Sequence, residues 1–68
     1  MDLKEVKSSN ISKVGYEDDN LYVQYNSGNL YRYKKVPKNV YKDLLESDSK
    51  GRYINSSVKS KYEYEKLK

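Results

Sequence analysis

The segment 21–33 constrains the fold most, because it combines an alternating apolar pattern with a turn that fixes how two strands pair. Its first five residues, Leu-Tyr-Val-Gln-Tyr, alternate with a period of two, which is typical of a half-buried strand. The Asn-Ser-Gly sequence at 26–28 suits a three-residue loop in which Gly28 is left-handed. This loop pairs Val23 with Tyr31 and gathers the large apolar side chains on one face of the hairpin, whereas a two-residue loop divides them between the faces.

The rest of the pattern predicts one strand before this hairpin and two helices after it. Residues 10–16 resemble a first strand, and a polar turn follows at 17–20. A helix over 37–46 begins at a proline, whose missing N–H costs nothing there, and carries an apolar stripe that suits the sheet. Ser-Asp-Ser at 47–49 offers N-cap candidates for the second helix. The alternating tail at 62–65 suits an edge strand or a segment that packs back.

These elements predict an α+β fold: a three-stranded antiparallel β-meander followed by two helices packed on one face. The chain has no internal repeat and no linker, so residues 1–68 are expected to form a single domain. Its core is expected to cover about residues 6–64, with frayed termini.

The chain has few means to stabilise a fold of this size. Leu, Ile and Val contribute 14 residues and Tyr contributes nine, while Phe, Trp and Ala are absent. Tyrosine rings must therefore supply much of the packing, and such a core is polar at its edges because each hydroxyl needs a partner. Chains below about 70–80 residues rarely gain more than about 3–5 kcal/mol from one core. Self-association is the remaining source of stability, so we expect a homo-oligomer.

The absent residue types exclude several kinds of chemistry. Without cysteine or histidine, the chain has no disulfide, no thiolate nucleophile, no imidazole base and no zinc or iron–sulfur site. The longest aliphatic run is Leu44-Leu45, which cannot span a membrane. Residues 1–5 lack the apolar core of a signal peptide. We expect a cytoplasmic protein, in a bacterial cell or a phage-infected host, that has no cofactor, no metal and no enzymatic activity.

Basic residues gather in the second half of the chain. Residues 1–33 hold four basic and five acidic residues, a net charge of −1, and residues 34–68 hold ten basic and five acidic residues, a net charge of +5. An uneven basic half suggests an anionic partner, such as a nucleotide or RNA phosphate. A solvated, lysine-rich surface explains the same distribution.

The most suggestive basic segment is Ser49-Lys50-Gly51-Arg52. If Ser49 caps a helix, the free amides of the three following residues face outward at the positive end of the helix dipole and form an anion site. Arg52 adds a forked phosphate contact, and Asn55, one turn later, suits a base or a ribose. Lys59 lies on a similar face. The alternative is an ordinary capped helix with solvated basic residues.

A second candidate group is Tyr31-Arg32-Tyr33, since aromatic rings beside a cation resemble platforms on which bases stack. The hairpin register places both rings on the covered face and Arg32 on the other. The rings then either belong to the core or line a cleft with a hydroxyl that reaches a ligand. Ser9 and Asn10, before the first strand, either form a turn or contact the ligand.

Taken together, the motifs resemble the KTSC domain, named for the C-terminus of some lysyl-tRNA synthetases and also found alone in bacterial and phage proteins. The resemblance covers roughly residues 6–64. It implies ligand contacts at seven polar positions and suggests RNA binding, because of the synthetase context. The matching motifs are Ser8-Ser9-Asn10-Ile11, Val14-Gly15-Tyr16, Gly28-x-x-Tyr31-x-Tyr33-x-x-Val36-Pro37 and Ser49-x-Gly51-x-Tyr53-x-Asn55-x-x-Val58-Lys59-x-x-Tyr62. The seven polar positions are Ser9, Asn10, Ser49, Gly51, Asn55, Lys59 and Tyr62.

Three functional hypotheses follow. The first is a non-catalytic nucleotide-binding protein that grips phosphate at a helix N-terminus; its small size also suits a phage protein that sequesters a cyclic or ADP-ribose-like immune signal. The second is a module that binds RNA or another single-stranded nucleic acid. The third is a structural oligomerisation domain. The predicted ligand residues are Ser9, Asn10, Arg32, Tyr33, Ser49, Lys50, Gly51, Arg52, Asn55, Lys59 and Tyr62.

Overall fold

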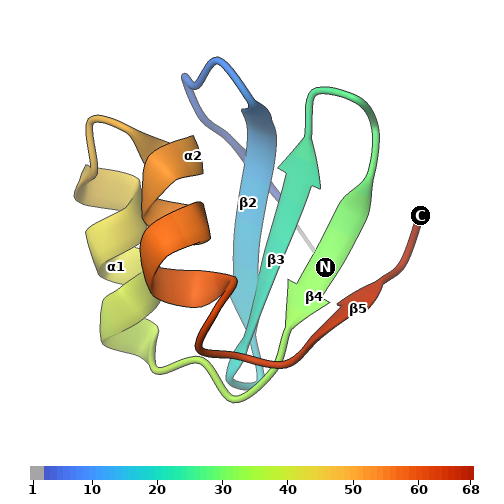
Figure 1. The fold of residues 1–68 in the computed structure, drawn as a ribbon, viewed down its shortest axis with the longest axis vertical. Coiled ribbons are helices and arrows are strands. Elements are labelled where there is room, and N and C mark those ends of the chain that lie inside the picture. Colours follow the sequence, from blue (N-terminus) through green and yellow to red (C-terminus); the bar gives the residue numbers. More distant parts are fainter. Residues whose placement is uncertain (1–2) are drawn as a thin grey trace.

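The computed structural model describes residues 3–68 and consists of one antiparallel sheet with helices against one of its faces (Figure 1). The strands lie side by side in the order β1-β2-β3-β4-β5. The α+β class is confirmed. In chain order the elements are β1 (Lys4–Glu5), β2 (Ile11–Glu17), β3 (Asn20–Tyr25), β4 (Leu30–Tyr33), α1 (Lys38–Glu46), α2 (Lys50–Tyr53), the π-helix η1 (Ile54–Val58) and β5 (Tyr64–Lys66).

The predicted number of three strands is wrong, because each end of the chain adds a short strand. β1 has two residues and pairs with β2, and β5 has three residues and pairs with β4. Two residues are too few to show an alternation. β5 pairs Tyr64 with Tyr33 and Glu65 with Arg32, and the tail sequence alone does not show this pairing with a distant segment. The edge strand considered for the alternating tail is the correct alternative.

The β3–β4 hairpin has the predicted register. Val23 lies opposite Tyr31, and the Tyr25 N–H donates to the carbonyl oxygen of Asn29 at 2.9 Å. Gly28 has φ 97°, a left-handed backbone that favours glycine because it has no Cβ. Its N–H donates to the Tyr25 carbonyl at 2.9 Å. The bulged loop is therefore confirmed, together with the face on which the apolar side chains gather.

The two helices begin close to the predicted positions. Pro37 is the N-cap of α1, not its first residue, because its ψ of 147° is still extended; the helix ends at Glu46 as predicted. Ser49 is the N-cap of α2, also as predicted. An unpredicted feature follows, since the helix widens into η1, where the Lys59 N–H donates to the Ile54 carbonyl at 2.7 Å.

The centre of the core is aliphatic, with one tyrosine. Other tyrosines of the covered face are partly buried and pack around this centre. Tyrosine rings therefore supply the rim of the core, and aliphatic side chains supply most of its centre. No helix within residues 3–68 is long and apolar enough to cross a membrane. The fully buried side chains are Ile11, Val14, Leu21, Val23, Tyr33, Val36, Leu44, Ile54 and Val58.

Candidate functional site

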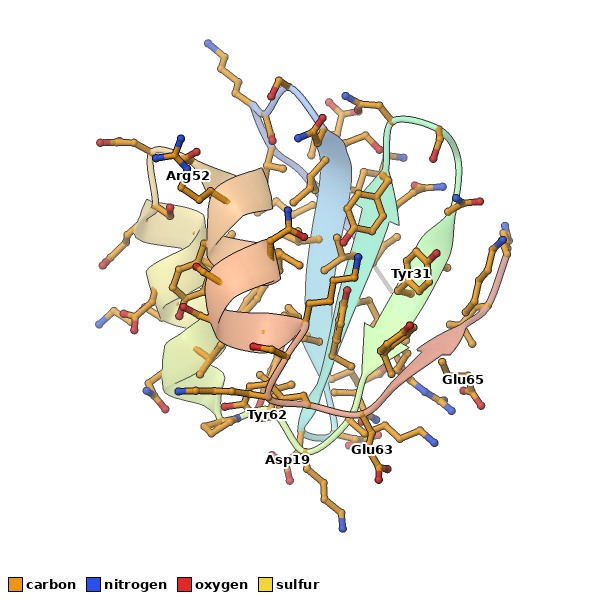
Figure 2. The ribbon with its side chains drawn as sticks, in the orientation of Figure 1. Asp19, Tyr31, Arg52, Tyr62, Glu63 and Glu65 are labelled. Atoms are coloured by element: carbon orange, nitrogen blue, oxygen red, sulfur yellow. The ribbon has the colours of Figure 1, made fainter. Side chains whose placement is uncertain are left out.

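Three cavities with shared lining residues form one groove along the α2–η1 helix, which faces the strands β3 to β5 at one end and the segment before β2 at the other. Their volumes are about 260, 340 and 500 Å³, and Asn55 lines all three. The first cavity is its tyrosine end, and the third is its α2 end. In Figure 2, Tyr31 stands on β4 facing the helix, and Arg52 stands at the start of α2. The tyrosine end is lined by Tyr25, Asn29, Tyr31, Tyr33, Asn55, Lys59 and Tyr64. The rest is lined by Ser9, Asn10, Tyr25, Asn26, Ser27, Ser49, Gly51, Arg52, Asn55 and Ser56.

Four tyrosines line the tyrosine end, and two of their ring pairs pack edge against face. The rings of Tyr25 and Tyr31 meet at 82° with their centroids 5.5 Å apart, and the rings of Tyr31 and Tyr64 meet at 72° and 5.7 Å. Such T-shaped pairs are favourable because the positive ring edge meets the negative face. Tyr31 is half-buried and Tyr64 is exposed. These rings therefore give the groove a firm aromatic wall that still meets solvent.

Tyr33 closes the inner end of this wall. It is 1% exposed, and its hydroxyl lies 3.3 Å from the hydroxyl of Tyr25. Burial, followed by the hydrogen bond to Tyr25, raises the pKa of Tyr33 well above its usual value, because the phenolate loses its hydration. Tyr33 is thus a neutral hydrogen-bonding group at neutral pH. Tyr33 belongs to the core, as the first alternative predicted, and also contributes to the lining of the tyrosine end.

Polar side chains line the middle of the groove, where the helix comes close to the segment before β2. A Cβ at Gly51 would lie 3.1 Å from Asn10 Nδ2, so the glycine makes room for this amide group. Asn26 Nδ2 donates to the Ser9 carbonyl at 2.8 Å and holds the same segment from the hairpin side. The amides of Asn10 and Asn55 thereby face one cavity.

The start of α2 differs from the predicted anion site. Ser49 occupies the N-cap position, but no side-chain cap bond forms there within the described residues; instead its N–H donates to Ser47 Oγ at 3.1 Å. Gly51 is buried beneath Asn10. This end of the groove is therefore formed mainly by polar side chains and not by a row of free backbone N–H groups.

Charge is one-sided along the groove. Arg52 and Lys59 are both exposed and lie at opposite ends of it. Among residues 3–68, neither forms an ion pair with a carboxylate. No Asp or Glu belongs to the described residues that line the three cavities. An anion in the groove would thus meet two unneutralised cations and no negative side chain.

The structure brings eight of the predicted ligand residues to this groove and leaves three elsewhere. Arg32 is on the opposite face of the sheet, where it forms an ion pair with Glu65. Lys50 Nζ donates to the Ser47 carbonyl at 2.9 Å and so supports the interhelical loop. Tyr62 lines a separate cavity of about 220 Å³ with Lys34, Lys35, Lys61 and Glu63.

Sequence reasoning missed the groove residues that come from the hairpin and β5. Tyr25 and Tyr31 were correctly placed on the covered face, but only the hairpin register combined with the position of the helix shows that they reach solvent. Asn29 follows the turn glycine and has no distinguishing pattern. Tyr64 belongs to the strand that was not counted. The sequence indicated this wall only through the alternative in which the rings of Tyr31 and Tyr33 line a cleft.

These features define the class of molecule as a small α+β module with a polar, tyrosine-walled groove between its sheet and its last helix. The KTSC domain model matches residues 7–62, and the chain therefore belongs to the KTSC domain family. The crystal structure of a KTSC domain protein from Yersinia pestis superimposes with a TM-score of 0.89 at 30% identity, covering 98% of this chain and 97% of that one.

Two kinds of sequence relatives are similar to the chain. A protein of Stutzerimonas stutzeri is 41% identical over 59 residues, which is 84% of this chain and 83% of that protein. A lysine–tRNA ligase of Nostoc punctiforme is 36% identical over 67 residues, which is 96% of this chain but 12% of the ligase. The module therefore corresponds both to nearly a whole small protein and to one segment of a large enzyme.

Proposed function

We propose that the groove binds a phosphate-bearing nucleotide and does not change it chemically. The observation that carries the proposal is the lining of the groove, which combines solvent-facing tyrosine rings, amide side chains and two cations, without a carboxylate among the described lining residues. A nucleotide has the complementary parts: a flat base, polar edges and a negative phosphate.

Each part of the ligand has a suitable partner in the groove. A base stacked on an aromatic side chain gains about 1–3 kcal/mol, and Tyr31 and Tyr64 offer such rings. Asn55 and Asn10 present amide groups that donate to and accept from base or ribose edges. Lys59 and Arg52 supply charge-assisted bonds to phosphate, and the planar Arg52 is able to make two in parallel.

Binding without catalysis agrees with the ionisation of the groove. A general base must be poised near the working pH. Burial shifts the pKa of Tyr33 upward, which is the wrong direction for a phenolate base at neutral pH. Saturable binding without turnover is also what a protein that sequesters a nucleotide signal requires.

Calorimetric titration with AMP, ADP, ADP-ribose and a cyclic dinucleotide tests the proposal. We expect at least one of them to bind with a fixed stoichiometry. Lys59→Ala should weaken that binding by about ten- to a hundredfold, since a hydrogen bond to a charged group is worth about 1.5–3 kcal/mol. The matched control is Lys42→Ala, which removes the same charge from the exposed side of α1 and should leave the affinity unchanged. Equal affinities for the two variants, or no saturation with any ligand, would reject the groove as the site.

The similarity to a segment of a lysine–tRNA ligase favours a second candidate, single-stranded RNA. Salt separates the two, because the logarithm of the RNA affinity falls with a slope of about −0.7 for each phosphate neutralised on a single strand. A steep slope with oligo-RNA, and no saturation with mononucleotides, would favour RNA. Failure of both ligands would leave the structural role of an oligomerisation domain.

A further inference from the structure

The outer edge of β5 exposes backbone groups that no other strand of the described chain covers. The Lys34 N–H donates to the Glu63 carbonyl at 2.8 Å, and the Leu67 N–H donates to the Leu30 carbonyl at 2.7 Å. Residues 63 and 67 therefore direct their backbone groups toward β4. Because successive residues of a strand alternate in this respect, the N–H and C=O of Tyr64 and Lys66 point away from β4. β5 is also the last strand in the sheet order.

The same edge carries exposed apolar side chains. Tyr64 is 51% exposed and Leu67 is 41% exposed, and within residues 3–68 they are the large hydrophobic residues in that state. Natural edge strands are usually protected by charges, prolines or bulges, because unpaired backbone groups invite another strand. Here the charges of β5 and its flanks have both signs, with Glu63 and Glu65 first and Lys66 and Lys68 after them.

We propose that a second copy of this chain pairs with β5, antiparallel and centred on Glu65, so that two sheets become one. In this arrangement Tyr64 and the partner's Lys66 lie opposite each other and exchange backbone hydrogen bonds through the groups that point outward. A twofold axis perpendicular to the sheet relates the copies. It repeats the pair on the other side of the axis and keeps the helices of both copies on the same face.

The side chains favour this register. On the helix-covered face, Tyr64 lies opposite the partner's Lys66, and such ammonium–ring pairs are favourable. On the other face Glu65 meets its own copy, but each of these carboxylates forms an ion pair with Arg32.

The two neighbouring registers are less favourable. A centre at Lys66 places two lysines opposite each other, and within residues 3–68 Lys66 has no ion-pair partner. A centre at Tyr64 places Glu63 opposite the partner's Glu65. Like charges directly across a strand pair are destabilising. Registers between these are excluded, because the twofold axis requires opposing residues to lie on the same face.

The dimer has a consequence for the groove. Tyr64 lines its tyrosine end, and the dimer brings the ammonium group of the partner's Lys66 beside that ring. Each groove would thus be completed by a cation from the other copy. The proposal itself stands on the strand edge alone and does not depend on nucleotide binding.

Sedimentation equilibrium without ligand tests the interface. We expect a monomer–dimer equilibrium for the wild type. Tyr64→Lys should weaken dimerisation about tenfold, because by symmetry it replaces two favourable cross-strand pairs with two repulsive ones. The double variant Tyr64→Lys with Lys66→Tyr restores a tyrosine opposite a lysine and should recover the dimer. A monomeric wild type at millimolar concentration would overturn the dimer. A double variant that dimerises no more tightly than Tyr64→Lys would overturn the register.

A second pair of variants tests the backbone contact. Lys66→Pro removes an N–H that points away from β4 and should abolish the dimer, whereas Lys66→Ala keeps the N–H and should retain most of it. Amide hydrogen exchange provides a further readout, because the N–H of Tyr64 and Lys66 should become protected as the protein concentration rises. Dimerisation by Lys66→Pro at wild-type strength, in a protein with a native circular dichroism spectrum, would place the contact elsewhere.

Discussion

At the scale of single residues, Gly51 sets how closely α2 approaches the segment before β2. A Cβ at this position would lie 3.1 Å from Asn10 Nδ2 and 3.5 Å from Asn10 Cβ. Glycine within a helix costs roughly 0.5–1 kcal/mol relative to alanine. Here the missing Cβ leaves room for the side chain of Asn10, which lines the groove. The glycine therefore has a packing explanation in the first turn of a helix that would otherwise favour alanine.

We predict that Gly51→Ala changes the free energy of unfolding by less than about 1 kcal/mol, because its gain in helix propensity opposes the crowding of Asn10. In an Asn10→Ala background the crowding is relieved, so Gly51→Ala should then stabilise the fold by roughly 0.5–1 kcal/mol. Urea unfolding of the four proteins measures this coupling. Equal effects of Gly51→Ala in both backgrounds would show that the two residues do not interact.

At the scale of elements, strand β4 divides its residues between two surfaces. Tyr31 and Tyr33 face the helices, and Arg32 faces the other way and meets Glu65. Successive side chains of a strand point to opposite faces, so no adjustment of a rotamer brings Arg32 into the groove. The motif that looked like a stacking platform is thus two rings in one site and a cation outside it.

We predict that Arg32→Ala leaves the affinity of the groove for its nucleotide within about twofold of the wild type, a difference of less than roughly 0.5 kcal/mol. Its cost to stability should be below about 1 kcal/mol, because ion pairs whose side chains still meet solvent contribute little. The titration used for Lys59→Ala supplies the first value, and urea unfolding supplies the second. A tenfold loss of affinity would return Arg32 to the ligand site.

The elements that were predictable are those specified by local chemistry. Gly28 and its neighbours fix the hairpin register, and Pro37 and Ser49 mark the helix starts within one residue. Strand β1 has two residues, too few to show a periodicity. Strand β5 lies in an alternating tail, but its partner β4 is about thirty residues away, so the alternation alone did not separate a strand from a segment that packs back. The π-helical turn at Ile54–Val58 also has no recognisable pattern in the sequence.

At the scale of the whole molecule, the tyrosines link the core to the groove. The pKa values of Tyr16, Tyr33 and Tyr53 are raised chiefly by desolvation on burial. A raised pKa in the folded state means that folding favours the protonated phenol. Its contribution to stability is complete below the ordinary pKa of about 10 and is lost as the pH rises toward the folded-state value.

We therefore predict that the stability of the protein is insensitive to tyrosine ionisation at neutral pH and falls above about pH 10. Each of these three tyrosines contributes up to about 1.4 kcal/mol per pH unit there. Tyr33→Phe should make this decline shallower, and at pH 7 it should cost about 1 kcal/mol through the lost hydroxyl contact with Tyr25. Urea unfolding between pH 7 and 11 tests both effects. A slope unchanged in Tyr33→Phe would contradict the assignment.

The site was predictable only where one segment supplied several of its residues. Arg52 and Asn55 lie three residues apart in the last helix and line the same cavity, so their common surface could be inferred from spacing. Lys59 follows the wide turn η1, which the helical spacing did not predict. The opposing wall comes from the hairpin and from β5, and the segment before β2 meets the helix at Gly51. Such relations between segments arise on folding and cannot be deduced from spacing along the chain.

The wide turn η1 gives the last helix a property that residue identities alone do not convey. Its closing hydrogen bond joins Ile54 to Lys59, five residues apart, where an α-helix joins residues four apart. The chain between Arg52 and Lys59 therefore contains one residue beyond α-helical geometry. Adding or deleting a residue there would rotate Lys59 by about 100° relative to Arg52. The number of residues in this turn, as much as their kind, determines which positive charges share the groove, so length variation here should be a marker of altered ligand preference within the family.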